Sequence, residues 1–178
     1  MALLFLCVCA AQPRNDLTGG FRYEVKLGQN SYLLNNAPGY ALDYSYRPLR
    51  WLRLEAGMEQ IFRPVGSSVF CRFVSNANDN LFLVPFGVRY VFEPRGIRVR
   101  LSLGGGGAYL NHTVGTPVEG VSGASGAGWQ IVAGGDYGLT HSGHFRAGVT
   151  ARYYYVYVGQ EVAARIFTIG PDFTFSFR

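Results

Sequence analysis

The sequence predicts an all-β fold, an eight-stranded antiparallel up-and-down barrel whose transmembrane strands close on themselves. Three observations predict it: segments of alternating apolar and polar side chains, connections that alternate in length, and a polar face rich in arginine with a single lysine. The 178 residues fit one domain, and no stretch reaches the 18 apolar residues of a membrane-spanning helix. A strand crosses a membrane with fewer residues, so alternation is the relevant signal.

Eight segments show the period of two that is typical of a strand, in which successive side chains point to opposite faces. In the last segment, DFTFSF, three phenylalanines alternate with polar residues almost to the end of the chain. An aromatic face at a chain end needs a partner that buries it, and we expect that partner to be lipid. The eight segments cover residues 21–27, 40–46, 52–59, 82–92, 97–104, 129–139, 145–157 and 167–177.

The connections between these segments are tight on one predicted rim and longer on the other. Tight turns occupy 47–50, 93–96 and 141–144, long connections occupy 63–80 and 111–126, and intermediate ones occupy 35–39 and 159–164. This is the plan of an outer-membrane barrel, with both termini on the periplasmic, short-turn side. Pro85 and Pro171 fall inside strands, where each removes a ladder hydrogen bond, so we expect β-bulges there.

Alternation alone does not say which face is inside, because a soluble barrel such as a lipocalin alternates with its apolar face inward. The apolar faces here carry no charge, whereas the polar faces carry both signs in near balance. Arginine forms forked hydrogen bonds with carboxylates, which suits an enclosed interior, and glycines on the polar face leave room for it. The predicted interior charge network comprises Arg22, Glu24, Lys26, Asp43, Arg53, Glu55, Glu59, Arg89, Arg98, Arg100, Asp136, Arg146, Arg152 and Asp172.

Aromatic residues gather near the ends of the predicted strands. Tyrosine has an apolar ring and a polar hydroxyl, a combination that suits the boundary between lipid and water. We therefore expect a lipid-facing or girdle position for Tyr44, Tyr46, Trp129, Tyr153, Tyr155, Phe173, Phe175 and Phe177.

The first residues resemble a secretory signal. Residues 2–11 are an unbroken apolar run, followed by a small-residue cleavage site and a polar stretch at 12–16. We assign 1–11 to a signal peptide and 12–178 to a single barrel domain; the missing basic start suggests that the natural N-terminus lies upstream. Removal of the signal would leave Cys71 as the only cysteine, unable to form an internal disulfide.

Three stretches resemble the small eight-stranded outer-membrane barrels of Gram-negative bacteria, the OmpA/OmpX-type family. They are LVPFGVRYVFEP (83–94), LSLGGGGAYLNH (101–112) and the aromatic-alternating C-terminus. The resemblance implies a location in the outer membrane, contact with outer-membrane lipid and lipopolysaccharide, insertion by the barrel-assembly machinery through the last strand, and a monomeric state.

Candidate catalytic and cofactor motifs are incomplete. The run Gly104–Gly107 lacks the Lys-Ser/Thr of a phosphate-binding loop, and no metal-ligand spacing occurs, so we expect no cofactor and no metal. The basic residues form no run, which argues against nucleic acid as a partner. Hydroxyl, imidazole and carboxylate groups do occur in the tight turn 141–144 and on the long-loop rim, without a recognisable motif: Ser67, Ser68, His112, Thr113, Glu119, His141, Ser142 and His144.

Three functions remain open at this point. The main hypothesis is a non-enzymatic barrel with a side-chain-filled interior, because eight strands leave a bore just wide enough to be filled. Its long connections, 63–80 and 111–126, would carry a structural or binding role in the envelope. The alternatives are a narrow pore for ions or small solutes and an enzyme that modifies lipid A.

Overall fold

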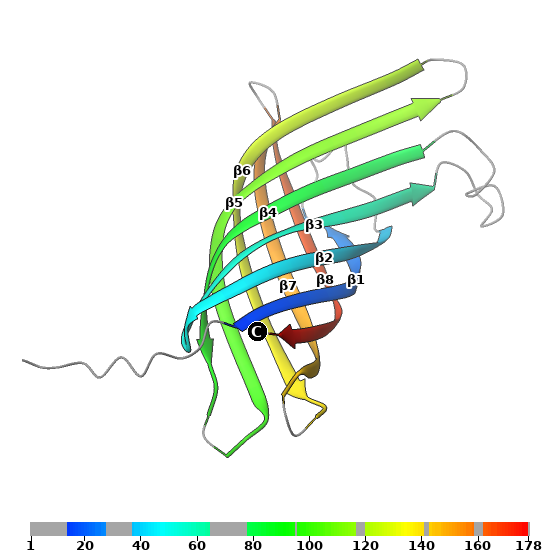
Figure 1. Cartoon of the computed structure of the whole chain (residues 1–178). Coiled ribbons are helices and arrows are strands. Elements are labelled where there is room, and N and C mark those ends of the chain that lie inside the picture. Colours follow the sequence, from blue (N-terminus) through cyan, green and yellow to red (C-terminus); the bar gives the residue numbers. More distant parts are fainter. Residues whose placement is uncertain are drawn as a thin grey trace, which may run out of the picture.

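Eight strands form one closed antiparallel barrel in which each strand pairs with its neighbours in sequence and β1 pairs with β8 (Figure 1). The computed structural model describes residues 14–27, 37–64, 78–94, 96–116, 120–140, 143–158 and 162–177. The strands are β1 (Arg14–Lys26), β2 (Ala37–Leu49), β3 (Leu52–Pro64), β4 (Asn78–Phe92), β5 (Val99–Thr116), β6 (Gly120–Gly138), β7 (Phe145–Val158) and β8 (Val162–Phe177). The predicted fold class is confirmed.

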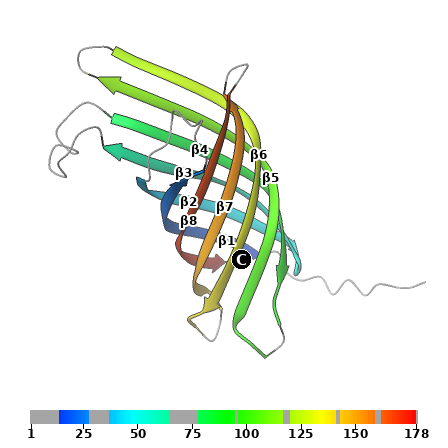
Figure 2. The ribbon, with the colours of Figure 1, turned by 180° about the vertical axis from the view of Figure 1, so that it is seen from behind.

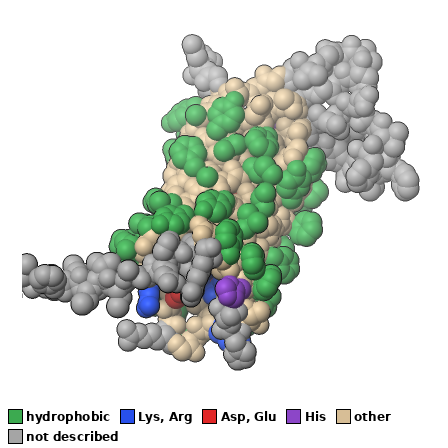
Figure 3. Space-filling model, viewed as in Figure 1, with side chains coloured by type: hydrophobic (Ala, Val, Ile, Leu, Met, Phe, Trp, Pro, Cys, Tyr) green, Lys and Arg blue, Asp and Glu red, His purple; other side chains and the backbone are tan. Residues whose placement is uncertain are grey.

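Alternation along each strand separates the inside of the barrel from the outside. In β2 the buried and exposed residues alternate from Ala37 to Arg47. Exposed hydrophobic side chains cover the outer wall, with Phe21, Tyr90 and Leu103 each more than half exposed (Figure 3). The arginines and carboxylates lie mostly inside. The described residues contain no helix that is long and apolar enough to cross a membrane.

The strands are longer than the alternation predicted, and they end at different heights. β1 begins at Arg14 rather than Phe21, because residues 14–20 pair with both β2 and β8. The expected long connection 111–126 is wrong, since β5 and β6 stay paired as far as Thr116 and Gly120. At this end β3 to β6 sweep to one side, beyond β1 and β2 (Figures 1 and 2).

The two prolines inside strands do not produce bulges, so this expectation was also wrong. Pairing partners keep one register on both sides of Pro85 and of Pro171. Each proline only interrupts the pairing with one of its two neighbouring strands, over a short stretch. The described register shift lies between β2 and β3 near Pro48, where the chain turns. On the same rim Gly96 and Gly143 have positive φ angles of 80° and 70°, which glycine adopts without strain.

The interior has two parts with different chemistry. The half nearer the short turns holds the charged groups, whereas the half nearer the long connections holds a hydrophobic cluster. Its members come from the loop-side ends of six strands: Ala37, Ile61, Leu81, Leu83, Ala108, Leu110, Tyr154, Val156, Ala164 and Ile166. The alternating pattern does not predict this cluster, because its residues interrupt the polar face.

Candidate functional site: a filled barrel interior

The cluster nearest the short turns is built around Asp16 of β1. Its Oδ2 atom lies 2.8 Å from Arg53 Nη2, 3.1 Å from Arg100 Nη1 and 3.3 Å from Arg47 Nε. Its Oδ1 atom accepts a hydrogen bond of 2.5 Å from the Ser176 hydroxyl of β8. One carboxylate thus joins arginines of β2, β3 and β5 to the last strand.

This Asp16 cluster continues toward the turn rim through further arginines. Arg100 Nε donates a 2.8 Å hydrogen bond to Asp136 Oδ2, and Arg146 pairs with the other oxygen of the same carboxylate. Arg47 also reaches Glu93, which is partly exposed beyond the end of β4, at 3.1 Å. The network therefore runs from the buried interior to the periplasmic rim.

A second cluster, centred on Arg152 of β7, occupies the middle of the barrel. Arg152 Nη1 lies 2.7 Å from Glu59 Oε1, and its Nη2 lies 3.0 Å from Asp43 Oδ1 and 3.5 Å from Glu55 Oε1. The side chain has no exposed surface. A cation held by three carboxylates at this depth is stable only because its partners surround it.

Arg22 of β1, the strand on the other side of β8 from β7, completes the Arg152 cluster. It lies 2.6 Å from Asp172 and 3.1 Å from Glu59, and its Nη2 is 3.7 Å from Asp43. Arg89 binds Glu55 at 2.5 Å.

Inward glycines make space for these carboxylates. A Cβ atom at Gly57 would overlap the Asp43 carboxylate, and one at Gly20 would overlap that of Asp172.

The two signs balance inside the barrel. Seven arginines and seven carboxylates of the described interior face one another: Arg22, Arg47, Arg53, Arg89, Arg100, Arg146 and Arg152 with Asp16, Glu24, Asp43, Glu55, Glu59, Asp136 and Asp172. These fourteen described groups are thus formally neutral as a set, and the net charge of +5 comes from the other residues of the chain. In the half of the barrel nearer the short turns, such a set acts as a polar core in place of a hydrophobic one.

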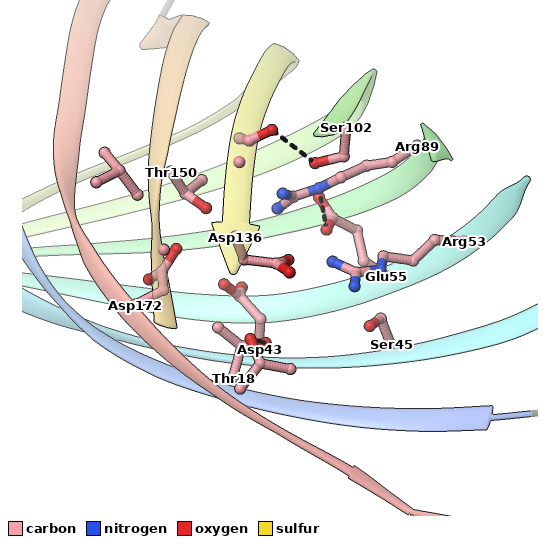
Figure 4. Close-up of a pocket in the computed structure, with 15 residues that line it drawn as sticks. Thr18, Asp43, Ser45, Arg53, Glu55, Arg89, Ser102, Asp136, Thr150 and Asp172 are labelled. Atoms are coloured by element: carbon pink, nitrogen blue, oxygen red, sulfur yellow. Dashed lines mark hydrogen bonds and ion pairs between the residues drawn. The ribbon is translucent and has the colours of Figure 1, made fainter. Parts of the chain in front are cut away.

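A small polar cavity lies between the two clusters (Figure 4). Its lining includes Asp43, Glu55 and Arg89 of the Arg152 cluster as well as Arg53 and Asp136 of the Asp16 cluster. Its volume of about 20 Å³ holds one or two waters, and its polar walls would bind them. The cavity is a gap within the ion-pair network, too small for a solute.

Twelve of the fourteen residues expected in the interior network have described side chains that belong to it. Arg98 does not: it precedes β5 and is exposed at the turn rim, where its carbonyl accepts a hydrogen bond of 3.0 Å from Arg146. The reason is that β5 begins at Val99, so the turn extends two residues further than the alternation suggested. Lys26 ends β1, but its side chain lies outside the described part and its interior position stays a prediction.

Sequence reasoning missed two members of the network, Asp16 and Arg47. Arg47 was assigned to a tight turn, although it continues the inward series of Asp43 and Ser45 along β2. Asp16 was assigned to a polar stretch after the signal peptide, because glycines at 19 and 20 weaken the alternation of β1. In both cases the spacing of two from an inward neighbour was the available signal.

The expected aromatic positions all lie on the outward face. Tyr44, Tyr46, Trp129, Phe173, Phe175 and Phe177 are 37–61% exposed, and Tyr153 and Tyr155 are partly covered by neighbouring rings. The rings form two groups, one near the turn rim on β2 and β8 and one near the loop rim on β6 and β7.

Few of the groups with catalytic potential are described. His112 points into the barrel and is 5% exposed, whereas Thr113 follows it on the outward face. Ser67, Ser68, Glu119, His141 and Ser142 lie outside the described residues, as does Cys71. Within the described part, no three His, Cys, Asp or Glu side chains are grouped to hold a metal ion.

Comparison with known proteins shows which family this barrel belongs to. The model of the outer membrane protein beta-barrel domain matches residues 1–175. The chain belongs to this family. The protein is therefore located in the outer membrane of a Gram-negative bacterium, and the apolar outer wall of the barrel faces the lipid. No curated protein shows significant sequence similarity to the chain.

Solved structures with the same fold are distant in sequence. Ail of Yersinia pestis, solved with the heparin analogue sucrose octasulfate, is 14% identical, with a TM-score of 0.64 over 93% of this chain and 99% of Ail. Neisserial surface protein A is 15% identical, with a TM-score of 0.66 over 93% and 97%. OprG of Pseudomonas aeruginosa is 11% identical, with a TM-score of 0.60 over 93% and 96%. At these identities the likeness concerns the fold alone.

Proposed function

We propose that this protein is a non-enzymatic, non-conducting barrel that acts through the surface it presents at the loop rim, in envelope integrity or in binding. The observation that carries the proposal is the filling of the interior. If the rigid barrel neither conducts solutes nor catalyses a reaction, its extracellular connections are the part that carries the function.

Two successive barriers support the non-conducting assignment. In the loop-side half, Ile61, Leu81 and Leu83 are fully buried in a hydrophobic cluster. Below them the guanidinium of Arg152 and the carboxylate of Glu59 meet at 2.7 Å in the middle of the barrel. An ion would have to displace both layers, and removing one partner of a buried ion pair costs about 3–5 kcal/mol.

Planar-bilayer recording tests this assignment directly. Refolded protein should give no discrete conductance steps, with insertion verified by the mobility difference between boiled and unboiled samples. A variant with Leu110→Ala and Ile166→Ala, which thins the hydrophobic layer, should raise the frequency of brief openings. Discrete steps from the unaltered protein that Arg100→Ala abolishes would favour the pore instead.

The enzymatic alternative receives little support from the described residues. His112 points inward and is buried, so it has no access to a lipid outside the wall. Mass spectrometry of lipid A from cells with and without the protein provides the test. We expect the same acyl pattern in both; a changed pattern would overturn the non-enzymatic assignment.

We further propose that the barrel is a monomer that the barrel-assembly machinery inserts through β8. Support comes from the closed sheet: β8 pairs with β1 from Asn15 to Lys26, so neither the first nor the last strand is left open to pair with a second copy. Site-specific crosslinking from Phe175 during assembly should capture the machinery, and light scattering in detergent should give one chain per particle. Absence of the crosslink or a stable dimer would contradict this assembly.

A further inference from the structure

One charged side chain breaks the apolar outer wall. Arg165 of β8 is exposed and alternates outward with Ala163 and Phe167. Among the outward strand side chains that the structure describes, it is the only charged one. Among the described residues of β7 and β8, no outward-facing carboxylate lies beside Arg165 to balance its positive charge.

The depth of Arg165 in the membrane follows from the strand geometry. It lies twelve residues before Phe177, which ends β8 at the periplasmic rim. At about 3.3 Å per residue and a tilt near 45°, this separation is about 28 Å along the membrane normal, whereas the apolar band of such barrels is about 25 Å tall. Arg165 is therefore at the outer edge of the apolar layer, where lipid headgroup phosphates begin.

Aromatic rings hold the Arg165 side chain in place. Trp129, Tyr155 and Arg165 are direct cross-strand partners on β6, β7 and β8. The Trp129 and Tyr155 rings stack at 5.4 Å with planes 11° apart, and Arg165 Cζ lies 5.8 Å from the centre of the Tyr155 ring. A guanidinium over a ring face keeps its N–H groups directed outward at its edge, ready for a bidentate acceptor.

We propose that Arg165, positioned by Tyr155 and Trp129, binds a phosphate group of lipid A in the outer leaflet. The lateral position on the lipid-facing wall favours a membrane lipid over a dissolved anion. Guanidinium and phosphate match in charge and in fork geometry, and the exposed Tyr157 beside Tyr155 adds an amphipathic ring at the same level. The site is distinct from the loops invoked for the proposed function and does not depend on them.

Fluorescence titration provides the test, because the chain has only two tryptophans. In a Trp51→Phe background, Trp129 alone reports on the site. We expect diphosphoryl lipid A in neutral detergent micelles to change its emission, and Arg165→Ala to weaken the apparent affinity about ten-fold, as expected for a lost charge-assisted hydrogen bond. Arg165→Lys should give an intermediate affinity, since it keeps the charge without the fork.

Controls separate the sources of phosphate and guard against misfolding. Arg98→Ala, at the opposite rim, should bind lipid A like the parent protein, and each variant must keep its boiled-versus-unboiled mobility shift. Native mass spectrometry counts bound lipid A independently of the tryptophan signal. Unchanged binding by both Arg165 variants, equal affinity for dephosphorylated lipid A, or equally tight binding of inorganic phosphate would each overturn the proposal.

Discussion

Replacement of Arg152 by methionine tests the idea that a balanced ion-pair network is the polar core of this barrel. Methionine keeps much of the side-chain volume and removes the charge. Glu59 then retains Arg22, and Glu55 retains Arg89, but Asp43 keeps only a distant contact of 3.7 Å with Arg22. The loss therefore falls mainly on Asp43, a residue that is only 5% exposed.

The expected cost follows from this uncompensated carboxylate. Removing one partner of a buried ion pair lowers the free energy of unfolding by about 3–5 kcal/mol. A second change, Asp43→Asn, removes the charge left behind and should recover about 0.5–3 kcal/mol, the range of coupling between residues in one network. The double variant should thus be more stable than Arg152→Met alone.

Equilibrium unfolding in urea, with the protein in lipid vesicles, measures both quantities. Tryptophan emission and gel mobility should report the same transition, which justifies a two-state analysis. Arg50→Met, at an exposed turn position, provides the control and should change the free energy of unfolding by less than about 0.5 kcal/mol. A loss below about 1 kcal/mol for Arg152→Met, or no coupling with Asp43, would refute the reasoning.

Two further substitutions test the packing of the interior by the same unfolding assay. Gly57→Ala places a Cβ atom against the Asp43 carboxylate and should lower the free energy of unfolding by about 1–3 kcal/mol. Gly19→Ala, with no atom within 4 Å of its Cβ position, should be nearly neutral, and equal effects of the two substitutions would contradict this packing. Leu83→Ala leaves a cavity in the loop-side hydrophobic cluster and should lower the free energy of unfolding by about 2–5 kcal/mol. Leu103→Ala on the lipid-facing wall should lower it much less, and the reverse order would place Leu83 outside the core.

Most of the fold could be predicted because the evidence for it is local. The side-chain period of two assigns each residue of a strand to a face without knowledge of its partners. Twelve network residues and the aromatic positions follow from that period. It fails where glycines dilute the pattern, as before Phe21 in β1, and at strand ends such as Arg47 and Arg98, where backbone pairing decides where the strand stops.

The loop-side cluster shows a second limit of the pattern. Leu81 and Leu83 are apolar residues on an inward face, so along the sequence they look like defects in the alternation of β4. Their burial is explained only by the closed barrel, in which residues from five other strands pack against them. The local pattern of one strand cannot predict this packing, since it depends on the register of the whole sheet.

The sequence by itself determined the all-β class, the eight strands, the apolar outer wall and the charged interior, because each depends on periodicity, turn residues and composition along the chain. The tertiary structure decided which charges meet. Arg152 and Glu59 are 93 positions apart, and Asp16 and Ser176 are 160 apart. Such contacts depend on strand tilt and closure of β8 on β1, which set the height of every side chain in the barrel.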